Sequence, residues 1–365
     1  MLIYIHLSVV IAFPSAFANK QALARTIKKC ARERISVRIE ANCIVCESCE
    51  PVELASELAS LFGIERVAIA KKASNNFSDL SNAIVEVGSK VIMPGDSFYV
   101  KVIQQAGKYD YVSRDVEFAA SGTLTARLSS INARPAKTEQ DASHLILTIV
   151  SKESAYVCLQ VFSAPGGLVT GSQGRVLSSI HSSLSFLSCL MAAKAGFEST
   201  IVLPFADESE LETNAKLAQL FATKTGTKKQ TILVMPINIP AKGADALMLK
   251  EKMMSKILIG HQDSWLLFPL TTAVHPIWLI ESIMQETLSA GKMPFAPLLF
   301  MSSELVTYAE DAGIELDLTV ARVTRDKLQK YSSTIDSEAK VAIRHTKRLE
   351  LKVGPNYLHE IIDSI

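Results

Sequence analysis

The chain has 365 residues, a length that favours two or three domains of ordinary size. Hydrophobic residues make up 48% and charged residues 21%, with 16 glycines and 13 prolines, which excludes disordered, collagen-like and disulfide-scaffold proteins. Because 38 Lys and Arg balance 37 Asp and Glu, a nucleic-acid binder with a high overall positive charge is also excluded, although a local basic face is compatible with the formal charge of +1.

An apolar segment opens the sequence, from Met1 to Phe13. Small residues of the kind found at signal-peptide cleavage sites follow it, but no basic residue precedes Lys20, as a secretory signal requires. The segment is also too short to span a membrane. We therefore predict a buried β-strand over Leu2–Ile11 and no membrane association.

The next elements predict a small α+β unit over residues 1–72. A helix is expected from Lys20 to Arg34, followed by an alternating strand at Ile35–Ala41, a helix that begins at Pro51, and a strand at Ile64–Ala70. This order is typical of a ferredoxin-like unit. The first helix has a basic face, made of Lys20, Arg25, Lys28, Lys29, Arg32 and Arg34.

A second α+β unit is predicted over residues 73–165. Its expected elements are a helix at Ser78–Ile92, a strand at Ser97–Ile103, a helix from about Ser113, and strands at Ser143–Val150 and Ser154–Phe162. The last two strands are separated by a very short connection, which indicates a hairpin.

From Gly174 onward strands and helices alternate, which predicts a doubly wound parallel sheet over residues 166–313. The expected strands are Ser199–Phe205, Gln230–Ile237, Lys256–Gly260 and Phe295–Phe300. The expected helices are Leu184–Ala195, Glu208–Thr223, Ala244–Lys256, Pro276–Ser289 and Ser302–Ala312. Residues 314–365 form a C-terminal extension of mixed polar and basic composition. The chain as a whole is therefore predicted to be of the α/β class.

Three closely spaced cysteines form the sharpest local motif, Cys43-x2-Cys46-x2-Cys49, which we expect in a loop before the helix at Pro51. Thiols at this spacing suit an iron–sulfur cluster or a zinc ion, with Cys30 as a fourth ligand. Because no second CxxC pair accompanies the motif, a loop with incidental cysteines is the alternative. Six cysteines in total are ordinary for a reducing compartment, so we expect a cytoplasmic protein.

A glycine-rich segment carries a resemblance to a known family. Residues 165–176, PGGLVTGSQGRV, resemble the GGLPxGTxGK/R segment of the tRNA 4-thiouridine synthetases, also known as thiamine-biosynthesis sulfurtransferases. Residues 190–205, LMAAKAGFESTIVLPF, and residues 293–301, MPFAPLLFM, are similar to two further segments of that family. The resemblance covers about residues 1–313.

This resemblance implies a ferredoxin-like N-terminal domain, a THUMP domain that binds RNA, and a PP-loop ATP pyrophosphatase domain of the adenine nucleotide alpha hydrolase-like type. They correspond to the units predicted at residues 1–72, 73–165 and 166–313. The organisation is similar to that of archaeal members, which have no rhodanese domain. The resemblance also implies tRNA as a partner and, in the family, ATP as a cofactor.

Family members bind ATP through a Ser-Gly-Gly-x-Asp-Ser loop. Backbone N–H groups at a helix N-terminus hold the phosphates there, and glycines let the backbone approach closely. The corresponding window here, Ser178 to Ser185, contains neither a glycine nor an acidic residue. We therefore predict a degenerate ATP site, for which simple helix capping is the alternative explanation. Its candidate residues are Ser178, Ser182, Ser183 and Ser185.

Sulfur transfer in this family needs an exposed cysteine with a low pKa. The last cysteine, Cys189, falls within an apolar helix and is interpreted as a core residue, and the CxxC pair of archaeal members is absent. His181, His261 and His275 have no metal-ligand partners at suitable spacing and are interpreted as structural or capping residues. No catalytic residue is assigned, so the sequence leaves open whether the chain is an enzyme.

RNA binding is the remaining function that the resemblance implies, through phosphate contacts whose affinity depends on salt. Family members carry adjacent basic residues at the end of the strand predicted at Ser97–Ile103, where this chain has Gln104 and Gln105. Each basic residue taken singly is also explained as a solvated surface charge. The candidate RNA-binding residues are Lys101, Lys108, Arg114, Arg127, Arg134, Lys137 and Arg175.

We therefore predict a tRNA-binding protein that acts in tRNA modification with a non-functional ATP site. The alternative is an active ATP-dependent tRNA sulfurtransferase, for 4-thiouridine and thiamine thiazole, that uses a remodelled loop and a cluster on Cys43, Cys46 and Cys49. A scaffold without an RNA role is a third hypothesis. Besides tRNA, a second copy of the chain and a separate catalytic sulfurtransferase are partners that the sequence leaves open.

Overall fold

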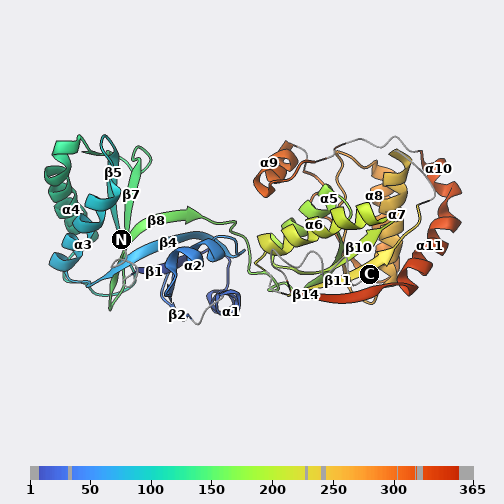
Figure 1. The fold of residues 1–365 in the computed structure, drawn as a ribbon, viewed down its shortest axis with the longest axis horizontal. Coiled ribbons are helices and arrows are strands. Elements are labelled where there is room, and N and C mark those ends of the chain that lie inside the picture. Colours follow the sequence, from blue (N-terminus) through green and yellow to red (C-terminus); the bar gives the residue numbers. More distant parts are fainter. Residues whose placement is uncertain are drawn as a thin grey trace. The chain divides into compact units, whose positions relative to one another are not determined.

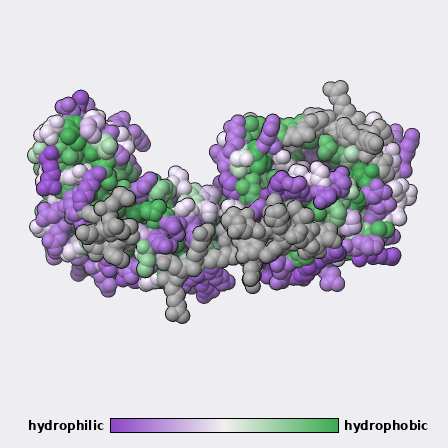
Figure 2. Space-filling view, in the orientation of Figure 1, coloured by the Kyte–Doolittle hydropathy of each residue, from purple (hydrophilic) through white to green (hydrophobic). Residues whose placement is uncertain are grey.

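The computed structural model describes residues 8–31, 35–226, 229–239, 244–301, 303–316, 318 and 324–352. The chain forms two compact units, residues 1–167 and 168–365. In the space-filling view, hydrophilic residues cover much of the visible surface of each unit, with smaller hydrophobic areas between them (Figure 2). Among the helices of the described residues, none is long and apolar enough to cross a membrane.

An eight-stranded sheet forms the centre of the first unit, in the order β2-β3-β1-β4-β8-β7-β5-β6 (Figure 1). Its strands are β1 (Ser8–Pro14), β2 (Ser36–Ile39), β3 (Ile44–Glu47), β4 (Ile64–Ala73), β5 (Ser97–Gln104), β6 (Arg134–Pro135), β7 (His144–Val150) and β8 (Ala155–Ser163). Neighbouring strands are antiparallel, except that β5 runs parallel to β6 and to β7.

The helices of the first unit begin where local sequence favours a helix start. They are α1 (Lys20–Cys30), α2 (Pro51–Leu58), α3 (Phe77–Val91) and α4 (Ser113–Leu128). The side chain of Asn19 caps α1 by accepting two backbone N–H groups, and Pro51 occupies the first turn of α2, where no N–H donor is needed. α3 and α4 pack their apolar faces on β5, β7 and β8 in one core.

β4 joins the two smaller units that the sequence predicted, because it crosses residue 72. It pairs with β8 from Arg66 opposite Ser163 to Ala73 opposite Ala155, so the ferredoxin-like and THUMP-like parts share one sheet. A hydrophobic cluster takes residues from β1, β3, β4, β7 and β8 and none from a helix. Strands of the two parts therefore bury one another.

A six-stranded sheet forms the centre of the second unit, in the order β13-β12-β9-β10-β11-β14. Its strands are β9 (Arg175–Ser179), β10 (Glu198–Phe205), β11 (Lys229–Pro236), β12 (Trp265–Leu267), β13 (Met293–Phe295) and β14 (Lys347–Lys352). β9 to β13 are parallel, and β14 pairs antiparallel with β11 at the edge. The unit is thus built on the doubly wound sheet that the sequence predicts.

The C-terminal extension is an integral part of this second unit. The helices here are α5 (Ser183–Lys194), α6 (Glu208–Lys224), α7 (Ala244–Gly260), α8 (Ile277–Ser289), α9 (Ser303–Ala312), α10 (Arg325–Lys330) and α11 (Ser332–Arg344). Ile335 and Ala339 of α11 belong to the same hydrophobic core as Met253 and Ile257 of α7, and α11 lies beside α7 (Figure 1). Together with β14, α11 completes the core and the sheet.

Three local predictions are wrong. The strand expected at Phe295–Phe300 is β13, Met293–Phe295, and a turn follows, because Pro297 has no N–H group to continue the ladder. Residues 256–260 continue α7 instead of forming a strand, because Ile257 and Leu258 are both buried in the helical core, and the neighbouring strand is β12. The cysteine segment forms β3, not a loop. The helix predicted to extend to Arg34 ends at Cys30 as α1, and residues 32–34 lie outside the described residues. Residues 2–7 of the first predicted strand also lie outside them.

Candidate functional site

The strand order of the second unit reverses between β9 and β12. From β9 the chain proceeds to β10 and β11 on one side, and it then returns to add β12 and β13 on the other side. In doubly wound sheets, ligands bind in the crevice at the carboxyl ends of the strands where this reversal occurs. Here that position lies between the segment after Ser179 and the segment after Leu267.

A small pocket occupies this position. Its walls are residues 181–184 at the start of α5, side chains of α7 including Lys250 and Glu251, and Val274 and His275 from the segment after β12. Its volume is about 80 Å³. Pockets for drug-sized ligands span about 300–1,000 Å³. The pocket is therefore smaller than pockets of that kind.

Serine hydroxyls accept hydrogen bonds from the backbone N–H groups at the start of α5. The hydroxyl of Ser185 accepts from the N–H groups of His181 and Ser182, both at 2.9 Å. The hydroxyl of Ser182 in turn accepts from the N–H of Ser185 at 3.2 Å, which makes a reciprocal capping box. Three donors that a phosphate-binding loop would present to its ligand are thus satisfied within the chain.

The four serines predicted for the ATP window have different surroundings. Ser178 is buried in β9, where its hydroxyl donates to the carbonyl of Thr200 at 3.2 Å. Ser182 and Ser183 line the pocket, whereas Ser178 and Ser185 do not. The structure therefore brings two of the four candidates to the pocket, and one of these, Ser182, is engaged in capping α5.

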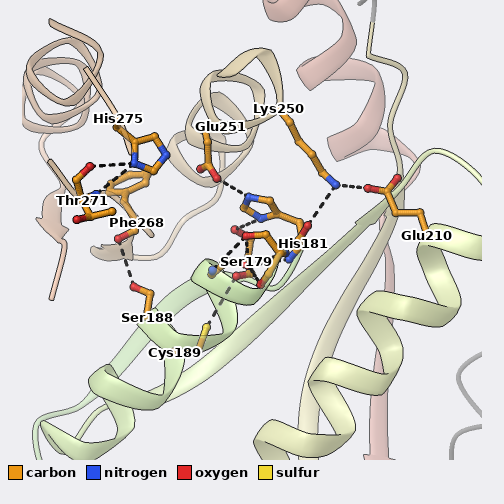
Figure 3. A network of polar contacts seen from close by, with 12 residues as sticks. Ser179, His181, Ser188, Cys189, Glu210, Lys250, Glu251, Phe268, Thr271 and His275 are labelled. Atoms are coloured by element: carbon orange, nitrogen blue, oxygen red, sulfur yellow. Dashed lines mark hydrogen bonds and ion pairs between the residues drawn. The ribbon is translucent and has the colours of Figure 1, made fainter. Parts of the chain in front are cut away.

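One ion pair joins His181, just before α5, to α7, and a second joins α6 to α7 (Figure 3). The Nε2 atom of His181 lies 2.8 Å from Oε1 of Glu251, and its Nδ1 atom lies 3.1 Å from the hydroxyl of Ser179. Lys250 pairs with Glu210, and its Nζ atom lies 3.4 Å from the carbonyl oxygen of His181. The side chains of His181 and Glu251 are only 2% and 12% exposed, so water does not screen this contact.

Glu251 is ionised at neutral pH in spite of its burial. Burial alone would raise the pKa of its carboxyl group. The charge and hydrogen bond of His181, with smaller contributions from His275 and Lys250, outweigh burial and lower the pKa of Glu251 below its usual value. A buried carboxylate thus lies at the pocket, and its negative charge disfavours an anionic ligand there.

Ser179, His181 and Glu251 follow one another in the order of a nucleophile, a base and an orienting acid. Such a triad acts only if its hydroxyl reaches a substrate. Ser179 is 3% exposed and does not line the pocket. The three side chains therefore hold the end of β9 to α7 and do not present a nucleophile, in agreement with the structural role that the sequence indicates for His181.

The predicted metal ligands are not brought together. Cys46 lies on β3 and Cys43 directly precedes that strand, and both are fully buried, whereas Cys49 is exposed. Cys43 belongs to a hydrophobic cluster with Val45 that does not include Cys46, because residues an odd number of positions apart in a strand point to opposite faces. Within the described residues, no three His, Cys, Asp or Glu side chains form a group that could hold a metal.

The buried cysteines are also unsuited to thiolate chemistry. Burial raises the pKa of Cys43, Cys46 and Cys189 to about 12, so all three thiols are protonated at neutral pH. Metal binding and sulfur transfer both use the thiolate. Cys189, which the sequence indicates as a core residue, is fully buried in α5.

Replacing Cys46 with serine is expected to lower the free energy of unfolding by about 1–3 kcal/mol, because the new hydroxyl is buried among apolar groups. Replacing the exposed Cys49 with serine is expected to leave stability unchanged. Urea unfolding of both variants, together with metal analysis of the anaerobically purified protein, provides the measurement. A metal site would instead make the two substitutions equally harmful and give near-stoichiometric iron or zinc.

Two of the seven predicted RNA-binding residues are paired with carboxylates. Lys101 pairs with Glu139, and Arg175 pairs with Glu198 at 3.1 Å. The remaining five are exposed: Lys108, Arg114, Arg127, Arg134 and Lys137. Arg114 and Arg127 lie at opposite ends of α4, about 20 Å apart along its axis and on different faces, since each residue adds about 100° and 1.5 Å.

Gln104 and Gln105, at the end of β5, have structural roles. Gln105 is 6% exposed; its Oε1 atom accepts from the N–H of Ala41 at 3.2 Å, and its Nε2 atom donates to the sulfur of Cys43 at 3.4 Å. Gln104 donates to the carbonyl of Tyr111 at 3.0 Å. Both amides thus tie β5 to neighbouring segments, and this strand end does not offer the phosphate contacts that the family resemblance implies.

Sequence reasoning missed Glu210, Lys250 and Glu251. The available signal was the charged run at residues 250–252, which interrupts the apolar helix α7. Charged residues within such a helix are buried only when they are paired, so the run pointed to partners elsewhere. The partners are 40 and about 70 residues away along the chain, and only the tertiary structure identifies them.

Comparisons with known proteins agree with the resemblance found in the sequence, although no family model matches. A curated protein from Methanosarcina mazei, described as "Probable tRNA sulfurtransferase", is 24% identical over 141 residues, which are 39% of this chain and 34% of that protein. A Bacillus pumilus protein with the same description is 20% identical over 146 residues, 40% of this chain and 34% of that protein. The matches thus span about a third of these relatives' length.

Solved structures match over most of the chain. A 4-thiouridine synthetase, crystallised with RNA and bound ATP, has a TM-score of 0.73 over 94% of this chain and 100% of that chain, at 14% identity. The protein PH1313 from Pyrococcus horikoshii has a TM-score of 0.63 over 84% of this chain and 99% of that chain, at 17% identity. The α/β fold class predicted from the sequence is confirmed, and the fold is that of the 4-thiouridine synthetases. The predicted resemblance to the tRNA sulfurtransferases is likewise confirmed.

Proposed function

We propose that this chain is a tRNA-binding protein that acts in tRNA modification and does not bind ATP. The role in tRNA modification is supported by the similarity to curated tRNA sulfurtransferases and by the fold of a 4-thiouridine synthetase that was crystallised with RNA. The proposed loss of ATP binding is carried by a single observation, the capping box at the start of α5. There the hydroxyls of Ser182 and Ser185 accept the hydrogen bonds of the backbone N–H groups.

Three physical features support the loss of ATP binding. Each residue of the turn after β9 carries a Cβ atom, which keeps phosphate oxygens away from the backbone. The pocket of about 80 Å³ is too small for a nucleotide. The ionised Glu251 places a negative charge where the phosphates would lie. A chain with these features would depend on a separate catalytic partner for the chemistry of modification.

The rival hypothesis is an active ATP-dependent sulfurtransferase, which would require a different arrangement of the side chains at the start of α5. It would need to release the donors held by Ser182 and Ser185, displace the His181–Glu251 pair and supply a thiolate. Cys189, in the same unit, is fully buried with a pKa of about 12. None of these observations favours the rival hypothesis.

Calorimetric titration with Mg·ATP and filter binding with tRNA together test the proposal. We expect no ATP heat at millimolar nucleotide, and tRNA retention that weakens steeply as salt increases, because phosphate contacts release counterions. Micromolar ATP affinity that is lost in the Ser183→Asp variant would contradict the ATP part; an aspartate at this first helical position is compatible with the helix. Absence of tRNA binding at low salt would contradict the RNA part.

A further inference from the structure

A cavity of about 580 Å³ lies beside α8 in the second unit, and the proposed function does not use it. A second cavity of about 220 Å³ adjoins it, since both are lined by Lys256, Trp278, Ser282, Glu286 and Arg325. Pockets that hold small ligands span about 300–1,000 Å³. These two cavities, here called the α8 cavity, therefore have the size of a ligand site, unlike the pocket of about 80 Å³ at the start of α5.

A network of ion pairs forms one wall of the α8 cavity. Lys252 of α7, whose side chain is 10% exposed, pairs with Glu286 and donates to the hydroxyl of Ser282 at 2.8 Å. The Nζ atom of Lys256 lies 3.1 Å from Oε2 of Glu286 and 3.3 Å from Oδ1 of Asp336 on α11. Because buried ion pairs add little net stability compared with apolar packing, helix packing alone does not explain this network. Its effect is a polar wall that is fixed in place.

The charges around the α8 cavity balance. Burial alone would raise the pKa of Glu286, but the hydrogen bonds and charges of Lys252 and Lys256 lower it, so the carboxylate is ionised at neutral pH. A phosphate or a metal ion would meet as many like charges as opposite ones here, whereas an uncharged polar ligand would not. The charged residues that line the cavity in the described part of the chain are Lys252, Lys256, Arg325, Glu281, Glu286 and Asp336.

Two residues that line the cavity have unused polar groups. Among the described residues, Arg325 has no salt-bridge or hydrogen-bond partner, and the indole N–H of Trp278 donates to no acceptor. Trp278 is half-buried and packs against the core of α7, α8 and α11, which holds its ring in place. An indole and a guanidinium both stack on flat rings. The side-chain amides of Gln285 and Gln329 add donors and acceptors that carry no charge.

We propose that the α8 cavity binds a nucleobase. The flat ring of the base stacks on Trp278 or on the guanidinium of Arg325, and its edge, which presents donors and acceptors without a charge, matches the glutamine amides. A free nucleoside and an unstacked base of an RNA share this chemistry. The proposal does not depend on the proposed function, because free nucleosides are its probes.

Tryptophan fluorescence provides a site-specific test, because the chain has two tryptophans. Trp278 lines both cavities, whereas Trp265 lies on β12 and lines neither. The Trp265→Phe variant therefore reports on Trp278, and the Trp278→Phe variant is its matched control. We expect at least one of adenosine, guanosine, cytidine and uridine to quench Trp278 saturably, with half-saturation at about 0.1–1 mM, and no saturable quenching of Trp265.

A second pair of variants, made in the Trp265→Phe background, tests the guanidinium. Arg325→Ala is expected to weaken nucleoside binding by about fivefold or more, because a stacking cation is lost. Lys330→Ala removes an exposed cation from the other end of α10 that lines neither cavity, and it is expected to leave the affinity unchanged. Thermal melting verifies that both variants are folded.

Three results would overturn the proposal. The first is unchanged emission of Trp278 at about 5 mM nucleoside, or equal quenching of the two tryptophans. The second is equal affinity of the Arg325→Ala and Lys330→Ala variants. The third is saturable quenching of Trp278 by inorganic phosphate and not by nucleosides, which would assign the cavity to anions. Competition by tRNA would identify an RNA base as the natural ligand, and its absence a free nucleoside; both agree with the proposal.

Discussion

Replacing Glu251 with glutamine is expected to lower the free energy of unfolding by about 3 kcal/mol, at the lower end of the range for breaking a buried ion pair. The Nε2 atom of His181 would lose the negative charge of its partner at 2.8 Å, in a place where the His181 side chain is 2% exposed. The cost stays at the lower end because the side-chain carbonyl of glutamine can still accept a hydrogen bond from His181. Urea unfolding followed by circular dichroism measures the change.

The pH dependence of this variant provides a second readout. In the wild type the pKa of Glu251 is lower in the folded state than in the unfolded state. The stabilisation from this group is therefore fully present above the unfolded-state pKa of about 4.3, and it is lost as the pH falls through the folded-state pKa. The variant cannot lose this contribution, so its stability should decline less steeply than that of the wild type below about pH 5.

A matched control for this substitution is Glu315→Gln, which removes an exposed carboxylate from the same unit. It is expected to leave the urea midpoint and the acid limb of the stability profile as in the wild type. If Glu251→Gln also left both unchanged, the His181–Glu251 pair would not hold β9 to α7 in solution.

Replacing Gly88 with valine is expected to destabilise the protein by about 2–3 kcal/mol through overpacking. Gly88 lies on α3, where a Cβ atom would come within 2.8 Å of the Ile146 side chain and 2.9 Å of the Leu124 side chain. Both neighbours are almost fully buried, so neither has free space to move into. Because the site joins α3, α4 and β7, the damage should also reduce tRNA binding by the first unit. Thermal melting and filter binding measure the two effects.

Gly122 offers the control for this prediction. It lies on α4, and a Cβ atom added to its backbone would meet no other atom within 4 Å. Gly122→Ala is therefore expected to stabilise the protein by up to about 1 kcal/mol, the usual gain of alanine over glycine in a helix. Equal melting temperatures for the Gly88→Val variant and the wild type would show that the α3–α4 contact tolerates a larger side chain.

Local sequence was sufficient to predict most helices and the strands β10 and β11, whereas β12 was not predicted and β13 lies N-terminal to the strand expected at Phe295–Phe300. Pro51 marks the start of α2, and Asp207 caps α6 by accepting the N–H of Glu210 at 2.9 Å. Such signals act over a few residues, so they are visible without the fold. β3 was missed because Ile44, Val45 and Cys46 are all buried on both sides of the sheet, which removes the alternation by which a strand is recognised.

By itself the sequence determined the α/β class, the doubly wound second unit and the absence of glycines from the turn after β9. The tertiary structure alone decided which groups occupy that turn. Lys250 and Glu251 are adjacent on α7, yet one pairs with Glu210 and the other with His181, because consecutive helical residues point about 100° apart. Contacts between residues 40 to 70 positions apart form only when the sheet brings α5, α6 and α7 together, and these contacts set the charges beside that turn.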